Sequence, residues 1–232
     1  MRLIAFDLET TGADPAEARI VTYALVSMTP DGVESMITGL VNPGIDIPEE
    51  ATAVHGVTTE QAQAGMHPVQ ALNQIMTVLA WGGGVSPVCA FNARYDMTVL
   101  AHELHRHNLP TNLLSVTPVV DPLILDRHFD KYRKGKRTLT ATSELYGCPV
   151  GEGAHDASAD AVAAGRIFYA LRDKYNLIRQ VDLQALHDTQ VIWAEEQAVS
   201  LEQYLRRTNP DARVDPRWPV ALDPVEAADA AA

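Results

Sequence analysis

The chain has 232 residues, of which 47% are hydrophobic and 21% are charged, and its formal net charge is −12 at pH 7. This length can bury the core of one substantial domain with a short appendage. The sequence excludes a membrane-spanning helix, because no stretch approaches the roughly 18 consecutive apolar residues that a span needs, and the acidic balance argues against coating duplex nucleic acid by charge alone.

The first part of the chain predicts a three-stranded meander followed by helices. Apolar and β-branched residues alternate with a period of two in segments that turn signals separate. We expect strands near residues 2–9, 19–29 and 35–42. The hydrophobic period then changes to that of a helix, with threonine and proline as start signals and glycine as a stop signal. We expect helices within residues 49–56, 58–65 and 67–84.

The middle of the chain alternates short apolar runs with amphipathic segments. Residues 86–92 and 115–122 have the pattern of buried strands, and a polar and basic stretch follows the second. The helical pattern appears within residues 94–108, 138–147 and 155–176. Strands that alternate with helices after a meander predict an α/β fold, with a mixed sheet and helices on both faces.

The last part of the chain continues the helical pattern from about residue 177. Apolar residues mark one face of a long helix, at Leu183, Leu186, Ala194, Ala198, Leu201 and Leu205. The segment after it has four prolines and an Ala/Asp-rich end, which predicts an extended arm that frays into disorder. We therefore divide the chain into a domain of residues 1–176 and a C-terminal helical extension with a flexible tail, residues 177–232.

The N-terminal residues are typical of a strand and have none of the features of a secretory signal. The two cysteines, Cys89 and Cys148, form neither a disulfide framework nor a paired metal motif. We expect a cytoplasmic protein with two reduced thiols.

The stretch "FDLETTG" places two carboxylates, Asp7 and Glu9, on one face of the first strand, because side chains two residues apart on a strand point the same way. The preceding "LIAF" is typical of a strand buried on both faces. Two like charges this close resist ionisation unless a cation lies between them. A solvated edge strand would tolerate the pair, so the strand end must open into a cleft for a functional interpretation to hold.

Two later segments offer partners for this pair. Asp96 follows a buried strand at the first turn of a helix, where an acid is also an ordinary helix-start residue. In "HDASADA", Asp156 and Asp160 share a helix face and His155 precedes them, although a histidine beside acids is commonly a surface residue. Neither segment is specific alone.

Taken together, the acids have the chemistry of a magnesium or manganese site. Asp7, Glu9, Asp96 and Asp160 supply hard oxygen ligands, and there is no thiolate cluster that would indicate zinc. Two such ions roughly 3.5–4 Å apart stabilise the attacking and leaving oxygens of a phosphodiester. A histidine with an ordinary pKa of about 6.5, such as His155, suits the base for the water near neutral pH.

The order "FDLETTG", "FNARYD", "HDASADA" resembles the three exonuclease motifs of the DEDD superfamily. The spacing of His155 and Asp160 is that of its His-bearing branch, the DEDDh or DnaQ-like family, typified by the proofreading epsilon subunit of bacterial DNA polymerase III. The segment "IPEEATAVHGVT" resembles the one that follows the third strand in those nucleases. The resemblance covers about residues 2–175.

The resemblance implies a ribonuclease H-like mixed five-stranded sheet and a two-metal hydrolase. Asp7, Glu9 and Asp160 would bind one metal, and Asp7 would bridge to a second ion that Asp96 helps to hold. His155 would deprotonate the attacking water. The reaction would release nucleoside 5′-monophosphates from the 3′ end of a strand.

The resemblance also implies contacts with the strand end. Thr10, Thr11 and Gly12 would grip the last nucleotide, His55 and Val57 would wedge near the terminal bases, and Tyr95 would stack on a base. A turn glycine, a helix-end histidine and a core tyrosine are the competing interpretations. Phe91-Asn92 stands where many relatives have His-Asn, which puts the substrate contact there in doubt.

The stretch "KYRKGKR" holds five of the chain's 18 Lys and Arg residues. A solvated loop would explain it, but in so acidic a chain we expect Lys134, Lys136 and Arg137 to track phosphates without reading bases.

We expect DNA 3′ ends, mainly single-stranded or mismatched, as the substrate in replication proofreading or repair. An exonuclease acting on RNA or short oligonucleotides stays open, because the motifs fix the reaction and not the sugar. A non-catalytic subunit of a replication complex is the alternative from another class. A DNA polymerase or a sliding clamp is a candidate partner, since "QVDLQAL" at residues 180–186 weakly resembles clamp-docking peptides.

Overall fold

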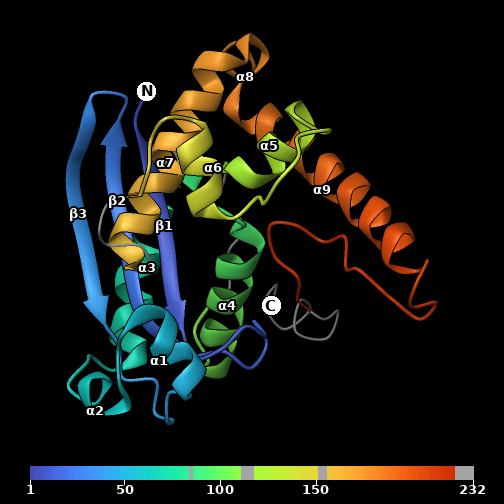
Figure 1. Cartoon of the computed structure of the whole chain (residues 1–232). Coiled ribbons are helices and arrows are strands. Elements are labelled where there is room, and N and C mark those ends of the chain that lie inside the picture. The colour runs from blue at the N-terminus through green and yellow to red at the C-terminus, as the bar shows by residue number, and fades with distance from the viewer. Residues whose placement is uncertain (84–85, 111–117, 151–155, 223–232) are drawn as a thin grey trace.

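The computed structural model describes residues 1–83, 86–110, 118–150 and 156–222 (Figure 1). These residues form a five-stranded sheet in the order β3-β2-β1-β4-β5. The strands are β1 (Leu3–Thr10), β2 (Ile20–Thr29), β3 (Gly32–Leu40), β4 (Val88–Cys89) and β5 (Val119–Val120). The first three are antiparallel, whereas β4 and β5 run parallel to β1. The predicted mixed sheet is confirmed.

Helices cover both faces of the sheet (Figure 1). One face packs against α3 (Pro68–Gly83) and α4 (Ala93–Arg106), and the other against α7 (Ala157–Lys174). The remaining described helices are α1 (Glu49–His55), α2 (Thr59–Ala62), α5 (Pro122–Phe129), α6 (Leu139–Leu145), α8 (Asn176–Gln180) and α9 (Leu183–Leu205). Within the described residues, none of the helices is long and apolar enough to pass through a membrane.

The two faces of β1 belong to different cores. Alternate residues of the strand, Ile4, Phe6 and Leu8, pack on the α3 and α4 side. Leu3 and Ala5 pack on the α7 side. Asp7 and Glu9 continue this second register, so their side chains point toward the beginning of α7. The strand is therefore apolar on both faces until the two acids replace the apolar residues of the α7 face.

A glycine lets α7 approach the sheet closely. A Cβ atom built on Gly165 would lie 2.4 Å from the sulfur of Met28 on β2. The absent side chain therefore permits close contact between helix and sheet. This contact brings the first turn of α7, which carries Asp160, to the carboxyl-terminal half of β1.

The polar and basic stretch after β5 contains a helix that sequence analysis missed. The side chain of Asp121 caps α5 by accepting a hydrogen bond from the Leu123 amide at 2.9 Å, and Pro122 occupies the first helical position. Strands β4 and β5 are also shorter than predicted, with two residues each. The rest of the predicted 115–122 strand lies partly outside the described residues.

The described part of the C-terminal segment, expected as an extended arm, packs back against the domain. In Figure 1 it returns from the end of α9 to α4. Trp218 is 6% exposed, and the Ala221 amide donates a hydrogen bond to Thr98 Oγ1 at 3.0 Å. The buried indole of Trp218 and the hydrogen bond of Ala221 hold this arm against the domain as far as residue 222. Residues 223–232, the predicted frayed end, lie outside the described residues.

The beginning of α9 is also part of the packed domain. Gln190 is fully buried, where its side chain accepts a hydrogen bond from the Asp121 amide at 2.8 Å and donates one to the Val119 carbonyl at 3.1 Å. The division at residue 176 stays a prediction, yet α9 completes the hydrogen bonding of edge strand β5.

Candidate active site

Three carboxylates converge at the end of β1. Asp7, Glu9 and Asp160 each offer an oxygen, and these oxygens all lie within 4.8 Å of one another. Asp96, from the first turn of α4, is only 4% exposed, and its Oδ1 accepts a hydrogen bond from the Leu8 amide at 3.1 Å. The structure thus brings all four sequence-predicted acids to one strand end.

The acids strongly perturb one another. Burial, followed by the charges of Asp96 and Glu9, raises the pKa of Asp7 well above its ordinary value. Burial and then the charge of Asp160 raise the pKa of Glu9 to about 8. Burial also raises the pKa of Asp96, although the Leu8 amide opposes the shift. Each shift means that the carboxylate form is costly without a cation.

This donor set fits a hard divalent cation. In the described ranges, no lysine or arginine forms an ion pair with Asp7, Glu9 or Asp96. The converging ligand atoms are all carboxylate oxygens, which suit Mg²⁺ or Mn²⁺. An external cation would therefore supply the positive charge that these protein side chains do not.

We expect the metal-free protein to lose stability as pH rises from about 4.5 to about 8, the window between the ordinary and the raised pKa of Glu9. In this window the folded protein holds protons that the unfolded chain has released, so raising the pH favours unfolding. A divalent cation held by these acids in the folded state should offset this loss, so we expect added Mg²⁺ to restore stability at pH 8. Melting temperatures in EDTA and in Mg²⁺ at pH 5 and pH 8 test this.

The matched variant is Asp7→Asn, which removes one of the crowded charges. It should show a smaller melting-temperature loss between pH 5 and pH 8 and a smaller gain from Mg²⁺ than the wild type. Identical pH and Mg²⁺ responses in the two proteins would contradict the assigned cluster.

A further buried carboxylate, Asp121, holds the loop between β4 and α4. It is 2% exposed and accepts hydrogen bonds from the amides of Asn92 at 3.0 Å and Ala93 at 2.9 Å, in addition to the cap of α5. Asn92 has a left-handed backbone with φ of 64°, which asparagine tolerates better than most residues. Burial raises the pKa of Asp121 to about 6. None of the sequence motifs predicted Asp121, although Asp-Pro after an apolar run is a typical helix-start signal.

The predicted "TTG" contact segment forms a turn tied to α4. The hydroxyl of Tyr95 donates a hydrogen bond to the Gly12 carbonyl and shares another with the Thr10 hydroxyl. Thr11 Oγ1 accepts from the Arg19 amide at 3.0 Å and closes the following loop. A Cβ atom on Gly12 would meet nothing within 4 Å. The space in front of Gly12 is open, as the approach of the 3′ end of a nucleic acid would require.

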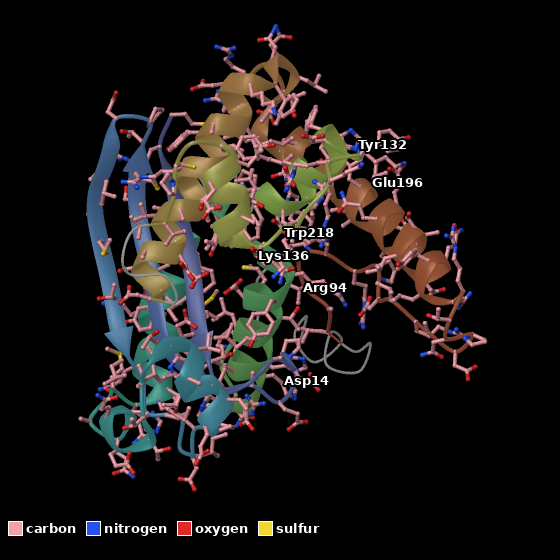
Figure 2. The ribbon with its side chains drawn as sticks, in the orientation of Figure 1. Asp14, Arg94, Tyr132, Lys136, Glu196 and Trp218 are labelled. Atoms are coloured by element: carbon pink, nitrogen blue, oxygen red, sulfur yellow. The ribbon has the colours of Figure 1, made fainter. Side chains whose placement is uncertain are left out.

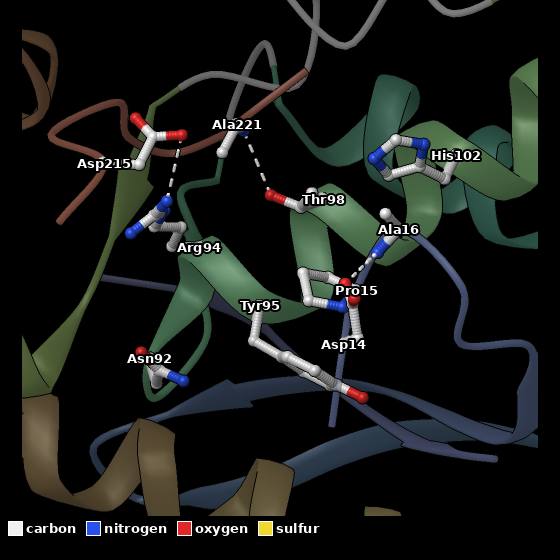
Figure 3. A pocket seen from close by; sticks show the side chains of 10 residues that line it. All are labelled: Asp14, Pro15, Ala16, Asn92, Arg94, Tyr95, Thr98, His102, Asp215 and Ala221. Carbon is white, nitrogen blue, oxygen red and sulfur yellow. Dashed lines mark hydrogen bonds and ion pairs between the residues drawn. The ribbon is translucent and has the colours of Figure 1, made fainter. Parts of the chain in front are cut away.

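The other residues that were predicted to contact the substrate line two separate cavities. A cleft of about 370 Å³ is lined by Glu9, His55 and Val57. A second cavity of about 420 Å³ is lined by Asn92 and Tyr95, together with residues of the first-motif loop and the C-terminal segment (Figure 3). One cavity is thus lined by residues of the first motif and of the segment after β3, and the other by residues of the second motif.

His55 and Phe91 have structural contacts as well. His55 Nδ1 accepts a hydrogen bond from the Val57 amide at 3.1 Å, and burial lowers the pKa of His55. The ring is therefore neutral near pH 7. Phe91 packs against the core on the α7 side. An apolar ring suits this position, where many relatives have a polar histidine.

The basic loop after α5 contains two kinds of cation. Arg133 and Arg137 both pair with Asp126, which is fully buried, at 2.7 and 2.5 Å. Lys134 and Lys136 are exposed and form no ion pair with any described residue (Lys136, Figure 2). Arg137 thus has a structural partner that the charge run did not reveal, and the two lysines are the better candidates for phosphate contacts.

Replacing Lys134 and Lys136 by glutamine should weaken binding of a single strand and flatten its salt dependence. The slope of log K against log salt should fall by about 1.4, because each phosphate contact on a single strand contributes about 0.7. Fluorescence anisotropy over a salt series measures the slope. Arg179→Gln, an exposed cation on α8, is the control, and an unchanged slope in the lysine variant would make the loop solvated surface only.

Two remaining predictions have different outcomes. His155 lies outside the described residues, and α7 begins just after it with Asp156 as its N-cap. Within the "QVDLQAL" segment, Leu186 is 2% exposed and Leu183 packs against the same core. The leucines that a clamp-docking peptide would use are therefore occupied within this domain.

A sheet of this order with acids at the end of its central strand defines the nuclease class that the motifs predicted. The family model described as "Exonuclease" (RNase_T) matches residues 4–168. The chain therefore belongs to this exonuclease family, and the DnaQ-like resemblance is confirmed.

Curated relatives include parts of replicative polymerases. The chain is 27% identical over 168 residues to "DNA polymerase III PolC-type" of Streptococcus agalactiae, covering 72% of this chain but 11% of that protein. It is 27% identical over 179 residues to "DNA polymerase III subunit epsilon" of Rickettsia prowazekii, covering 74% of each. The chain thus spans about a tenth of the PolC-type relatives.

Solved structures share the fold. Escherichia coli Exonuclease I in complex with a dA16 oligonucleotide has a TM-score of 0.64 and 17% identity, covering 76% of this chain and 42% of that one. The nuclease domain of 3′hExo, a DEDDh family member bound to rAMP, has a TM-score of 0.62 and 16% identity, covering 75% and 92%. The predicted ribonuclease H-like fold is confirmed.

Proposed function

We propose that this protein is a metal-dependent 3′–5′ exonuclease that releases nucleoside 5′-monophosphates from single-stranded or mismatched DNA 3′ ends in replication proofreading or repair. The convergence of the Asp7, Glu9 and Asp160 carboxylates, with Asp96 beside them, carries the proposal. The similarity to an epsilon subunit and to PolC-type polymerases supports DNA as the substrate and a polymerase as a partner.

The acids divide between two cation sites. Asp7, Glu9 and Asp160 would hold one Mg²⁺ or Mn²⁺ ion, and Asp7 with Asp96 would hold a second. When bound, the two ions stabilise the charge on the attacking and leaving oxygens of the phosphodiester. The buried Asp96 also fixes its own position through the Leu8 amide.

The remaining residues position the strand end and move a proton. The turn of Thr10 to Gly12, held by Tyr95, lies against the last nucleotide, and His55 with Val57 borders the terminal base. His155 accepts the proton of the attacking water. The water oxygen bonds to phosphorus as the P–O3′ bond breaks, and the departing O3′ takes a proton from solvent water. The products are a nucleoside 5′-monophosphate and a strand with a new 3′-hydroxyl.

Digestion of 3′-labelled single-stranded DNA, mismatched duplex and RNA tests this proposal, each with Mg²⁺, Mn²⁺ and EDTA. We expect labelled mononucleotide from the DNA substrates with either metal and none with EDTA. Faster release from RNA would favour the exoribonuclease, whose site must contact the 2′-hydroxyl. Binding without hydrolysis in every metal would favour a non-catalytic subunit.

His155→Ala should lower kcat by about 10²- to 10⁴-fold, the usual contribution of a general base, with little change in the Kd for single-stranded DNA. Single-turnover kinetics and anisotropy separate the two quantities. His105→Ala, at an exposed position of α4, is the control. An unchanged kcat in His155→Ala would remove this residue from the base role.

A further inference from the structure

A groove lies between the end of α5 and the second half of α9. Its volume is about 530 Å³, and its walls include Arg127, Lys131, Trp193, Leu201 and Tyr204. Helix α9 follows the segment that matches the exonuclease family, which ends at residue 168. The wall formed by α5 and the loop after it lies within the matched segment, whereas the wall formed by α9 lies beyond it.

One wall of the groove is cationic in an acidic protein. Residues 127–137 hold six of the 18 Lys and Arg residues of a chain whose net charge is −12. The buried Asp126 neutralises part of this charge through its two arginine partners. Arg127 and Lys131 are exposed and pair with no described carboxylate, whereas Glu196 is the acid on the α9 wall. The balance of charge suits a polyanion.

Exposed aromatic rings flank the cationic wall. Tyr132 is 88% exposed on the loop after α5, and Tyr204 is 63% exposed on α9. Trp193, within the groove, already has a stacking partner, because its ring lies on that of His128 with the centroids 3.7 Å apart. Base stacking on exposed tyrosines is a common way to hold single strands without reading their sequence. In Figure 2, Tyr132 and Glu196 are both labelled at the upper right of the view, near α5 and α9.

Helix α5 connects this groove to the catalytic acids. At its start, Asp121 binds the amides of Asn92 and Ala93 in the loop that leads to Asp96. At its end, Arg127 and His128 line the groove. The helix has eight residues and a length of about 12 Å, so the groove and the loop that leads to Asp96 lie at opposite ends of one short helix.

We propose that the groove between α5 and α9 binds single-stranded nucleic acid on the 5′ side of the reacting end. Arg127 and Lys131 contact phosphates, and Tyr204 and Tyr132 stack on bases. The inference rests on the proposed exonuclease function, since it assumes that a 3′ end enters the acid cluster. It gives the C-terminal helix a role in retaining long substrates.

The test compares kcat/KM for a single-stranded 20-mer and for a trinucleotide that ends before the groove. The wild type should prefer the 20-mer. Tyr204→Ala combined with Arg127→Ala should reduce the ratio of kcat/KM for the 20-mer to kcat/KM for the trinucleotide by about tenfold. This change lies within the usual effect of one lost stacking contact. Tyr204→Phe keeps the ring and should keep the ratio. Leu177→Ala with Arg179→Ala on α8 is the control pair.

The trinucleotide separates the two proposals. If the wild type cleaves neither substrate in Mg²⁺, the exonuclease proposal fails. If it cleaves both and the groove variant keeps the wild-type ratio, the groove proposal fails, and the exposed apolar residues of α9 would then face a protein partner. A melting temperature within a few degrees of the wild type confirms that the variant is folded.

Discussion

Asp7→Asn should reduce Mg²⁺-dependent release of nucleotides by at least about 10³-fold in kcat/KM. Asp7 is the acid on which the other charges converge, since Asp96, Glu9 and Asp160 all raise its pKa. An amide keeps the size of the side chain but removes the charge that two cations would share. Cation stabilisation of the transition state is worth several kcal/mol, and each 1.36 kcal/mol is tenfold in rate.

The same substitution should not harm the fold. Removing one of several crowded charges relieves repulsion in the metal-free protein, so its melting temperature in EDTA at pH 8 should equal or exceed that of the wild type. Mn²⁺ titration followed by electron paramagnetic resonance should show weaker binding. Asp31→Asn, an exposed acid in the turn between β2 and β3, is the matched control. Wild-type activity in Asp7→Asn would disprove the metal assignment.

The candidate acids could be predicted from sequence because strand periodicity is strict. Asp7 and Glu9 had to share a face, and a strand buried on both sides made their charges costly. The order of the three motifs then supplied Asp96 and Asp160. The sequence did not show that the face of Leu3 and Ala5 is the one covered by α7, which depends on the topology of the whole sheet.

The missed features depend on long-range contacts. The stretch after Asp121-Pro122 looks polar and basic in sequence, although Asp-Pro is a typical start of a helix such as α5. Arg137 belonged to a charge run whose solvated and paired members look alike in sequence, and only the fold shows that it reaches Asp126. The composition of the proline-rich segment near Trp218 predicts an extended arm, but only the fold shows that Trp218 is buried and that Ala221 bonds to Thr98.

Asp121→Ala should destabilise the protein by about 3 kcal/mol or more. Its carboxylate accepts hydrogen bonds from the partly buried amide of Asn92 and from the buried amides of Ala93 and Leu123. Each buried donor left without a partner costs about 1–3 kcal/mol. For a chain of this size the melting temperature should fall by about 6–12 °C. Thermal unfolding followed by circular dichroism measures the loss.

Asp121→Asn separates stabilisation from positioning. Its single carbonyl oxygen can still accept from Asn92 and Leu123, but its amide nitrogen faces the Ala93 donor, so we expect a smaller loss of stability. Because Asp121 fixes the loop that leads to Asp96, both variants should also lose kcat at temperatures well below their melting points, while KM changes less. If kcat there equals that of the wild type, Asp121 stabilises the fold without orienting Asp96, whose carboxylate the Leu8 amide also holds.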